Sequence, residues 1–368
     1  MTGAKRTGAE RGRVSDEPRP TDAGRVGGNR ELAGAEQEGE ERADSGTDGV
    51  RAGVERDEAT RRDSNALAAA AENPRARFLF VSGSRVAVEP GAERVLALSA
   101  GCVAPEARRR AVYLGLVDGA PYFACDVGDA DDSARDSRLV SRAIPAASRP
   151  AAVAEEDERA WSVSADFASV PLTSHLWPSV EAELAVEAVA ISNWIGGTRF
   201  CHRCGEPLSL RSGGWEMVCG RGHTVFPRVD PAVIMAVRDA EDRLLLARNG
   251  RWAPGRLSVL AGFVEAGEPL ESAVAREVLE ETGVVVDDVA YVTSQPWPFP
   301  RSLMLAFEGR TRARQEDVKV DGEELVFARF FSREEFSGAL ASGEIGLPTP
   351  TSVSARLIER WLGRPLVG

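Results

Sequence analysis

The glutamate-rich segment between residues 262 and 284 limits the possible folds of this chain more than any other feature of its 368 residues. Pro269 suits the first turn of a helix and Gly283 suits its C-terminal cap, so the segment predicts a helix over about residues 269–282. Apolar residues recur in it every four positions and predict a buried stripe, formed by Leu270, Val274 and Val278. Three acidic residues lie three and four positions apart and therefore gather on a neighbouring face: Glu277, Glu280 and Glu281.

These three glutamates need a positive partner, because like charges at this spacing destabilise a helix by roughly a few tenths of a kcal/mol per pair. Arg276 supplies part of that charge, and hard divalent cations, which bind carboxylates together with water and phosphate oxygens, supply the rest. The loop from Gly262 to Gly267 enters the helix, so its backbone can approach a phosphate closely. Glutamates on a helix usually form only a solvent-exposed face. The pattern around them must decide between such a face and a metal site.

The surrounding pattern is GX5EX7REUXEEXGU, where U is an aliphatic residue, and the sequence fills every specified position. It resembles the Nudix box, the signature of enzymes that hydrolyse a nucleoside diphosphate linked to another group. The resemblance implies that Glu277, Glu280 and Glu281 hold two to three Mg²⁺ or Mn²⁺ ions per site, which would lower the pKa of an attacking water. It also implies that Arg276 orients a carboxylate and that Glu268 supports the loop or a metal.

A second motif, the segment SQPWPFPRS at residues 294–302, begins eleven residues after Gly283. It resembles the SQPWPFPxS array of NADH pyrophosphatases, and its three prolines make the strip rigid. The resemblance implies that Gln295, Trp297 and Ser302 bind substrate. It implies hydrolysis of NAD(H) to nicotinamide mononucleotide and AMP, removal of NAD caps from RNA, and a homodimer.

The same resemblance extends to residues outside the two motifs. The segment 321–325 matches the one from which the family supplies a further catalytic or metal-binding glutamate, which is Glu324 or, as the alternative, Glu323. Phe226 and Phe263 match aromatic positions that enclose the nicotinamide ring in that family, and the less favoured alternative is that both are core residues. Ser354 matches a small residue near the nicotinamide end.

A cysteine cluster precedes the Nudix box. A CxxC knuckle at residues 201–204 is followed by a second half at residues 219–223, and two such turns supply the ligands that tetrahedral zinc needs. The predicted ligands are Cys201, Cys204, Cys219 and His223, with His202 as the alternative for the fourth. A site with four protein ligands is closed, so we expect its role to be structural.

These motifs divide the chain into four parts. Residues 1–75 have almost no large apolar residue and predict a disordered tail. Short apolar runs and a helical pattern over residues 179–195 predict a small α+β domain at 76–195, with no internal sequence repeat. A zinc ribbon is expected at 196–228 and a Nudix domain at 229–368, an α/β/α sandwich with a mixed sheet. The fold class is therefore α+β.

Net charge and cysteine content limit which partners the protein can bind and in which cellular compartment it can be expected. A net charge of -12 disfavours general binding to nucleic-acid backbone. The odd count of five cysteines does not suggest a disulfide framework, and we expect Cys102 and Cys125 to be buried in apolar surroundings. The hydrophilic start of the chain is unlike a secretory signal, and no apolar run approaches the ~20 residues that span a bilayer. We therefore expect a cytoplasmic protein that does not bind membranes.

Two other functions remain open on the sequence. One is a Nudix hydrolase for another nucleoside diphosphate derivative, such as ADP-ribose or a nucleotide sugar, which the intact 294–302 motif disfavours. The other is a zinc-ribbon RNA-binding protein with a degenerate Nudix domain. The complete set of glutamates and the acidic net charge disfavour that interpretation.

Overall fold

The structure is a computed structural model that describes residues 53–128 and 165–366. Most of the predicted tail, residues 1–52, lies outside the described residues. The end of the tail differs from the prediction, because α1 (Glu58–Arg62) and α2 (Ser64–Glu72) are helices. Asp57 and Asp63 cap them through side-chain hydrogen bonds to backbone amides, and alanine, which fills most of α2, has the highest helix propensity. Composition alone therefore placed the tail boundary too far along the chain.

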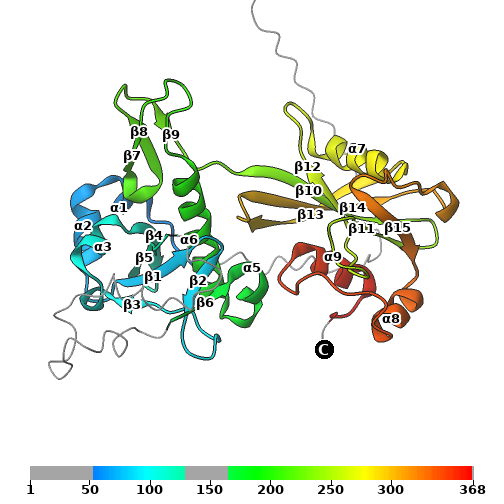
Figure 1. Cartoon of the computed structure of the whole chain (residues 1–368), viewed down its shortest axis with the longest axis horizontal. Helices are drawn as coiled ribbons and strands as arrows, with labels where there is room; N and C mark the ends of the chain where they lie inside the picture. The colour runs from blue at the N-terminus through cyan, green and yellow to red at the C-terminus, as the bar shows by residue number, and fades with distance from the viewer. Residues whose placement is uncertain (1–52, 129–164, 367–368) are drawn as a thin grey trace, which may run out of the picture. The chain divides into compact units, whose positions relative to one another are not determined.

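The first sheet confirms the predicted α+β character of the N-terminal region (Figure 1). Its strands follow the order β4-β5-β1-β2-β6, with β3 beside β1, and only the β1–β5 pair among them is parallel. The strands are β1 (Arg77–Ser82), β2 (Arg85–Val88), β3 (Leu98–Ser99), β4 (Val112–Val117), β5 (Ala120–Asp126) and β6 (Asp166–Ser169). The helical segments are η1 (Ala100–Cys102), α3 (Pro105–Arg110), α5 (Val170–Thr173), η3 (Ser174–Leu176) and α6 (Ser179–Gly197).

A small three-stranded sheet follows α6 at the predicted ribbon. It contains β7 (Leu208–Arg211), the turn η4 (Ser212–Gly214), β8 (Glu216–Cys219) and β9 (Thr224–Val225). Trp215 joins it to β4 by donating from Nε1 to the carbonyl of Tyr113 at 2.7 Å, and the guanidinium of Arg61 lies 4.0 Å from the centre of the Trp215 ring. The N-terminal helix α1 is therefore packed against the ribbon.

The second sheet is mixed, in the order β13-β14-β10-β11-β15 with β12 beside β10. The pair β10–β14 is parallel and the other pairs are antiparallel. The strands are β10 (Asp230–Arg238), β11 (Leu244–Asn249), β12 (Leu260–Phe263), β13 (Asp287–Trp297), β14 (Ser302–Arg310) and β15 (Leu325–Phe331). The helical segments are α7 (Leu270–Thr282), η5 (Gln315–Asp317), α8 (Arg333–Ala341) and α9 (Val353–Leu362).

Alternation along β10 explains why helices cover both faces of this sheet. Ile234 and Ala236 face a core shared with α8 and α9, whereas Val233 and Met235 face a second core shared with α7. Figure 1 shows α7 and α9 on opposite sides of the sheet. The predicted α/β/α sandwich is confirmed, and α7 covers the predicted helix over 269–282 except for its first residue.

The two sheets repeat one topology, although the sequence shows no repeat. Strands β1 to β6 take the same places in the first sheet that β10 to β15 take in the second, including the parallel central pair and the short strand beside the centre. The helix at the place of α7 is α3, which has the sequence PEARRR and a single glutamate. The first sheet thus has the fold of the second without its carboxylate helix.

Two smaller findings concern cysteines and membranes. Cys125 is buried, as predicted, but Cys102 is exposed, because it ends a 3-10 turn after the short β3 and does not lie within a strand. None of the helices in the described ranges is both long enough and apolar enough to span a bilayer.

Candidate active site

Arg276 is the centre of the acidic cluster on α7. It contacts the Glu268 carboxylate in a bidentate pair, with Nε–Oε1 at 2.8 Å and Nη2–Oε2 at 2.9 Å. Its Nη1 donates to Glu277 Oε1 at 2.9 Å and to Glu280 Oε2 at 3.1 Å, and its Nη2 donates to the carbonyl of Phe263 at 3.0 Å. The hydrogen bonds to Glu268 raise the pKa of Arg276, so one permanent positive charge orients three carboxylates and the loop before the helix.

Glu268 also fixes the loop that enters α7. Its Oε2 accepts a hydrogen bond from the backbone amide of Glu265 at 3.1 Å, and the hydrogen bond from Arg276 holds its pKa below the usual range. Glu277 is placed differently, because its carboxylate lies directly against the backbone of Gly262 in β12. A Cβ at residue 262 would overlap that carboxylate, well inside 3.0 Å. The glycine of the motif is therefore required by close approach, not by its backbone angles.

Glu281 is a buried acid whose ionised form has no compensating cation among the described residues. Its side chain is buried, and its Oε2 has no hydrogen-bond partner among the described residues. Burial, and then the negative charges of Glu324 and Glu277, raise the pKa of Glu281 to about 8. Burial likewise raises the pKa of Glu277. An unpartnered carboxylate oxygen among converging negative charges fits a divalent cation.

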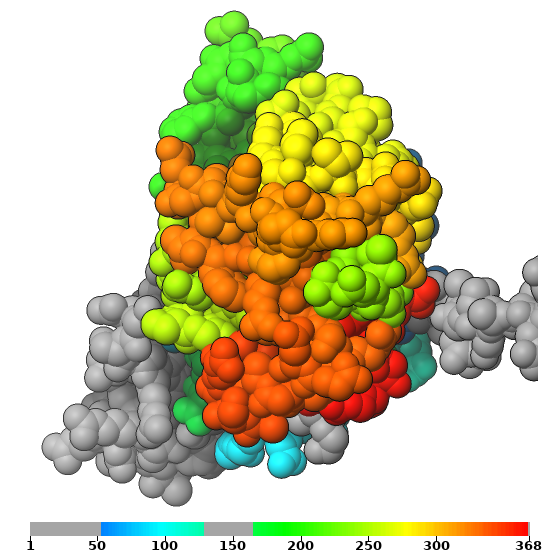
Figure 2. Space-filling view, turned by 90° about the vertical axis from the view of Figure 1, so that its right-hand side faces the viewer, coloured from blue at the N-terminus to red at the C-terminus, as the bar shows by residue number. Residues whose placement is uncertain are grey.

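Glu324 reaches this cluster from the loop before β15. The backbone amide of Asp321 donates to the carbonyl of Glu281 at 3.2 Å, and the amide of Lys319 donates to the carbonyl of Thr282 at 2.9 Å. This loop therefore lies against the C-terminal end of α7. Figure 2 shows the yellow residues around α7 directly beside the orange residues that come later in the chain. Glu324 lines the same cavity as Glu281 and Glu323 does not, so the geometry favours Glu324 of the two candidates.

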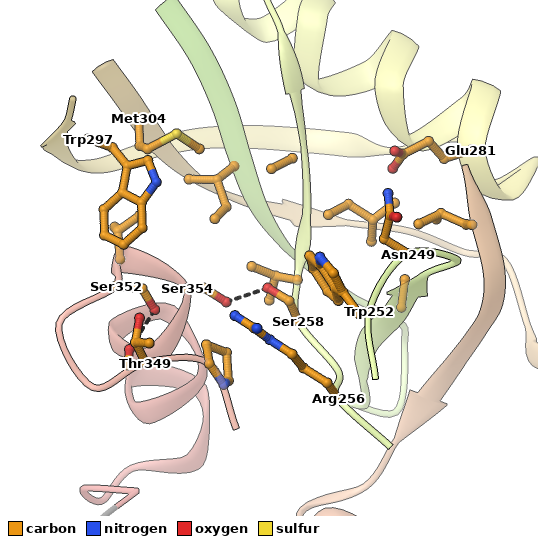
Figure 3. A pocket seen from close by; sticks show the side chains of 18 of the residues that line it. Asn249, Trp252, Arg256, Ser258, Glu281, Trp297, Met304, Thr349, Ser352 and Ser354 are labelled. Atoms are coloured by element: carbon orange, nitrogen blue, oxygen red, sulfur yellow. Dashed lines mark hydrogen bonds between the residues drawn. The ribbon is translucent and has the colours of Figure 1, made fainter. Parts of the chain in front are cut away.

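A cavity of about 240 Å³ opens beside Glu281 and Glu324. Of the predicted substrate-binding residues, Gln295, Trp297 and Ser354 line it. In Figure 3, Glu281 lies at one side of the view, while Trp297 and Ser354 lie at the other. The structure therefore brings two acidic residues, Glu281 and Glu324, to the same pocket as Gln295 and Trp297 of the 294–302 motif.

Gln295 has a role that its sequence motif does not reveal. Its Nε2 donates to the carbonyl of Thr351 at 2.6 Å, and its Oε1 accepts from the amide of Val353 at 2.6 Å. Both ends of the side-chain amide are thus used to join β13 to the start of α9. Ser354, at this start, shares a hydrogen bond of 2.7 Å with Ser258. Gln295 therefore positions the wall of the pocket that carries Ser354.

Three predicted residues lie outside this pocket. Phe226 and Phe263 are 64% and 60% exposed, so they are not core residues, and neither lines the cavity. Ser302 begins β14 opposite Trp297 and also does not line it. Sequence reasoning missed several lining residues: Asn249, Trp252, Arg256, Ser258 and Met304. They belong to no motif, and four of them lie on or beside the loop between β11 and β12.

The predicted metal ligands of the ribbon come together in space. One ligand atom from each of four residues lies within 4.8 Å of the others: Cys201, Cys204, Cys219 and His223. Although burial opposes it, hydrogen bonds from backbone amides lower the pKa of the Cys201 thiol to about 6, which suits a metal-binding thiolate. His223 Nδ1 lies 3.6 Å from Cys201 Sγ, so His223 and not His202 is the fourth member of the group.

We predict that Cys219→Ser removes the metal from the ribbon and loosens residues 199–226. Metal content measured on the purified protein should fall by about one equivalent, and limited proteolysis should cut within this segment, because structural zinc stabilises small ribbons directly. Cys102→Ser is the matched control, since Cys102 is exposed and outside the cluster. Unchanged metal content in Cys219→Ser would contradict the ligand set.

Comparisons with known proteins find two related domains in the chain. The profile of the NUDIX domain matches residues 228–348, and that of the NADH pyrophosphatase-like rudimentary NUDIX domain matches residues 73–194. The second match explains the repeated topology of the two sheets. A NUDIX hydrolase from Nitrosomonas europaea of known structure is similar with a TM-score of 0.36 and 21% identity, over 46% of this chain and 95% of that one.

Curated relatives extend over most of the chain. The NAD-capped RNA hydrolase NudC of Mycobacterium bovis is 37% identical over 321 residues, which are 84% of this chain and 93% of that protein. The NAD-capped RNA hydrolase NUDT12 of Macaca fascicularis is 38% identical over 195 residues, 50% of this chain and 42% of that protein. The chain is therefore an enzyme of the Nudix hydrolase superfamily and belongs to its NADH pyrophosphatase-like family.

Proposed function

We propose that this enzyme hydrolyses the diphosphate of NAD(H) to nicotinamide mononucleotide and AMP, and that it removes NAD caps from RNA to leave a 5′-monophosphate. The observation that carries the proposal is the shared pocket of Glu281, Glu324, Gln295 and Trp297. It places groups suited to a metal-bound diphosphate beside the motif that resembles those of NADH pyrophosphatases. The mycobacterial and primate relatives are NAD-capped RNA hydrolases, which supports the removal of NAD caps.

The residues that would hold two to three Mg²⁺ or Mn²⁺ ions are Glu277, Glu280, Glu281 and Glu324. When bound, such ions polarise the diphosphate and lower the pKa of a water molecule that attacks phosphorus. The protein's own contribution is positional. Arg276 holds Glu277 and Glu280 in place, Glu268 holds the preceding loop, and Gln295 holds the pocket wall at α9.

The remaining assignments are parts of the same proposal. We assign one structural zinc ion to the ribbon, supported by the clustering of its three cysteines and His223. Phe226 and Phe263 are assigned to the nicotinamide ring and Ser302 to the substrate, and the high exposure of the two aromatic rings leaves them free for such a contact. We also propose a homodimer, which sedimentation can test, and a cytoplasmic location.

The decisive assay incubates purified protein with NADH and Mg²⁺ or Mn²⁺ and separates the products by chromatography. We expect reduced nicotinamide mononucleotide and AMP from the wild type, and a loss of roughly 10²-fold or more in Glu280→Gln, because that change removes a metal ligand. Glu271→Gln is the matched control, since Glu271 is an exposed residue of the first turn of the same helix. Intact NADH with either metal would reject the substrate, and equal rates in Glu280→Gln would reject the assigned metal site.

A further inference from the structure

The pocket wall that contains Trp297 is in contact with the rudimentary domain, residues 73–194. Asn193 of α6 donates from Nδ2 to the carbonyl of Pro298 at 2.9 Å, although the two residues are 105 positions apart in the chain. Pro298 is buried and directly follows Trp297, in the turn between β13 and β14. A side chain of the first domain therefore reaches the motif at residues 294–302, and the mechanism described above gives that side chain no role.

Phe299 connects Trp297 to the core of the rudimentary domain. The rings of Trp297 and Phe299 meet edge to face, with their centroids 5.1 Å apart and an interplanar angle of 85°. Phe299 in turn packs against the hydrophobic core between the first sheet and α6, which includes Leu114 and Leu184. Because Trp297 lines the cavity, the position of one pocket wall depends on packing that another domain contributes.

The segment before α9 makes a second contact of the same kind. Thr351 donates from Oγ1 to the carbonyl of Pro171 in α5 at 3.0 Å. The carbonyl of Thr351 also accepts the hydrogen bond from Gln295, and Ser354 lines the cavity from the first turn of α9. The rudimentary domain thus contacts two segments of the pocket wall, both at the end of the pocket away from Glu281 (Figure 3).

The 294–302 motif needs such outside support because of its prolines. Pro296, Pro298 and Pro300 have no N–H group, so none of them can donate a backbone hydrogen bond to β14 or within the turn. The carbonyl of a buried residue needs a donor, and Asn193 supplies one to Pro298. Helix α6 is a rigid place for this donor, since eight of its 19 residues are buried.

We propose that Asn193 is a positioning residue for the reaction, which acts through the turn at Pro298 to hold Trp297 in the pocket wall, and that the rudimentary domain contributes to the active site in this way. Helix α3 of that domain has a single glutamate, so it cannot supply the set of carboxylates that α7 supplies. The inference deepens the proposed function and rests on it for the identity of the substrate. The step at phosphorus is unchanged.

Asn193→Asp tests the contact with a side chain of the same shape. An aspartate oxygen cannot donate to the carbonyl of Pro298 and, when ionised, repels it. We expect KM for NADH to rise by roughly fivefold or more, with kcat changed by less than about twofold, because the carboxylates at the other end of the pocket are untouched. Asn65→Asp, the same change at an exposed site in α2, is the matched control. Partial unfolding would instead lower kcat and leave KM unchanged.

The increase in KM should also depend on Trp297. If Asn193 acts by holding this ring, then Asn193→Asp should raise KM by less than about twofold in the Trp297→Ala background, where no ring remains to be held. An equal increase in both backgrounds would show that Asn193 affects the pocket by a route that does not include Trp297, and would overturn the proposal.

A second readout needs no substrate. The fluorescence of Trp297 is obtained as the difference between each protein and its Trp297→Phe variant. Acrylamide should quench this difference signal more strongly in Asn193→Asp than in the wild type or in Asn65→Asp, because the ring is held less firmly in the wall. Equal quenching in the three proteins would contradict the role of Asn193.

Failure of the inference and failure of the proposed function are distinguishable. A higher KM that requires Trp297, together with stronger quenching, supports the assignment. Unchanged KM or unchanged quenching in Asn193→Asp overturns it, and hydrolysis of NADH by the wild type then leaves the proposed function standing. If the wild type hydrolyses no NADH with Mg²⁺ or Mn²⁺ present, the proposed function is rejected, and the quenching of Trp297 alone decides whether Asn193 positions the wall.

Discussion

Glu281→Gln should lower NADH hydrolysis by roughly 10²-fold or more and, at the same time, make the metal-free protein more stable. The loss of activity is expected because Glu281 is the buried member of the carboxylate set and lines the pocket. The gain in stability is expected because its charge is disfavoured by burial and by the neighbouring Glu324 and Glu277. A neutral amide of the same shape removes that repulsion.

The gain in stability of Glu281→Gln over the wild type should increase as pH rises. The pKa of Glu281 is raised from 4.5 to about 8 in the folded chain, so between these values the folded protein retains a proton that the unfolded chain releases. The free energy of unfolding of the metal-free wild type therefore falls as pH rises through this window, by roughly 1–3 kcal/mol. Glu281→Gln lacks this ionisation and should not show that part of the decrease.

Thermal unfolding in the presence of a chelator can measure this difference at pH 5 and pH 9. The melting temperature of Glu281→Gln should exceed that of the wild type at pH 9 by about 2–4 °C per kcal/mol, and the two should approach one another at pH 5. Glu271→Gln on the same helix should follow the wild type at both values. Equal stability of Glu281→Gln and wild type at pH 9 would mean that the uncompensated charge at Glu281 does not exist in solution.

The sequence predicted α7 and the clustering of the ribbon cysteines with His223 well, because both depend on local rules. Helix spacing places Glu277, Glu280 and Glu281 together whatever the rest of the chain does, and Gly283 ends the helix in a left-handed conformation, as expected. Two tight turns likewise bring the ribbon cysteines together over a short stretch. The contacts that position Ser354 could not be predicted from the sequence in the same way. Gln295 makes them with backbone groups more than fifty residues away along the chain.

Long-range pairing accounts for what the sequence did not predict. The two sheets share one topology, but they share no motif, because only the second sheet retains the carboxylate helix. Arg256 and Trp252 lie on a loop without a recognisable pattern, and the loop reaches the pocket only through its backbone hydrogen bonds to Gly346. Helices α1 and α2 were missed because alanine-rich segments with charged residues look disordered by composition, whereas their caps and their contact with Trp215 make them ordered.

Gly262→Ala should reduce activity by roughly 10²-fold or more without unfolding the protein. Residue 262 has ordinary strand geometry in β12, so alanine is compatible with the backbone. Its methyl group would nevertheless overlap the carboxylate of Glu277, which must move and thereby leave its hydrogen bond with Arg276. A displacement of this size at a metal ligand is expected to affect kcat more than it affects KM.

Shortening the displaced side chain tests this explanation directly. If the methyl group acts by steric overlap with Glu277, then Gly262→Ala should cost several-fold less in the Glu277→Asp background than in the wild type, since aspartate withdraws the carboxylate by one methylene group. Gly338→Ala in α8, where a Cβ would meet nothing within 4 Å, is the control for a general effect of replacing glycine, and it should leave activity unchanged. Additive effects of the two changes would show that Gly262 matters for another reason, such as the approach of substrate to the backbone, because only a shared contact makes the cost of one substitution depend on the other.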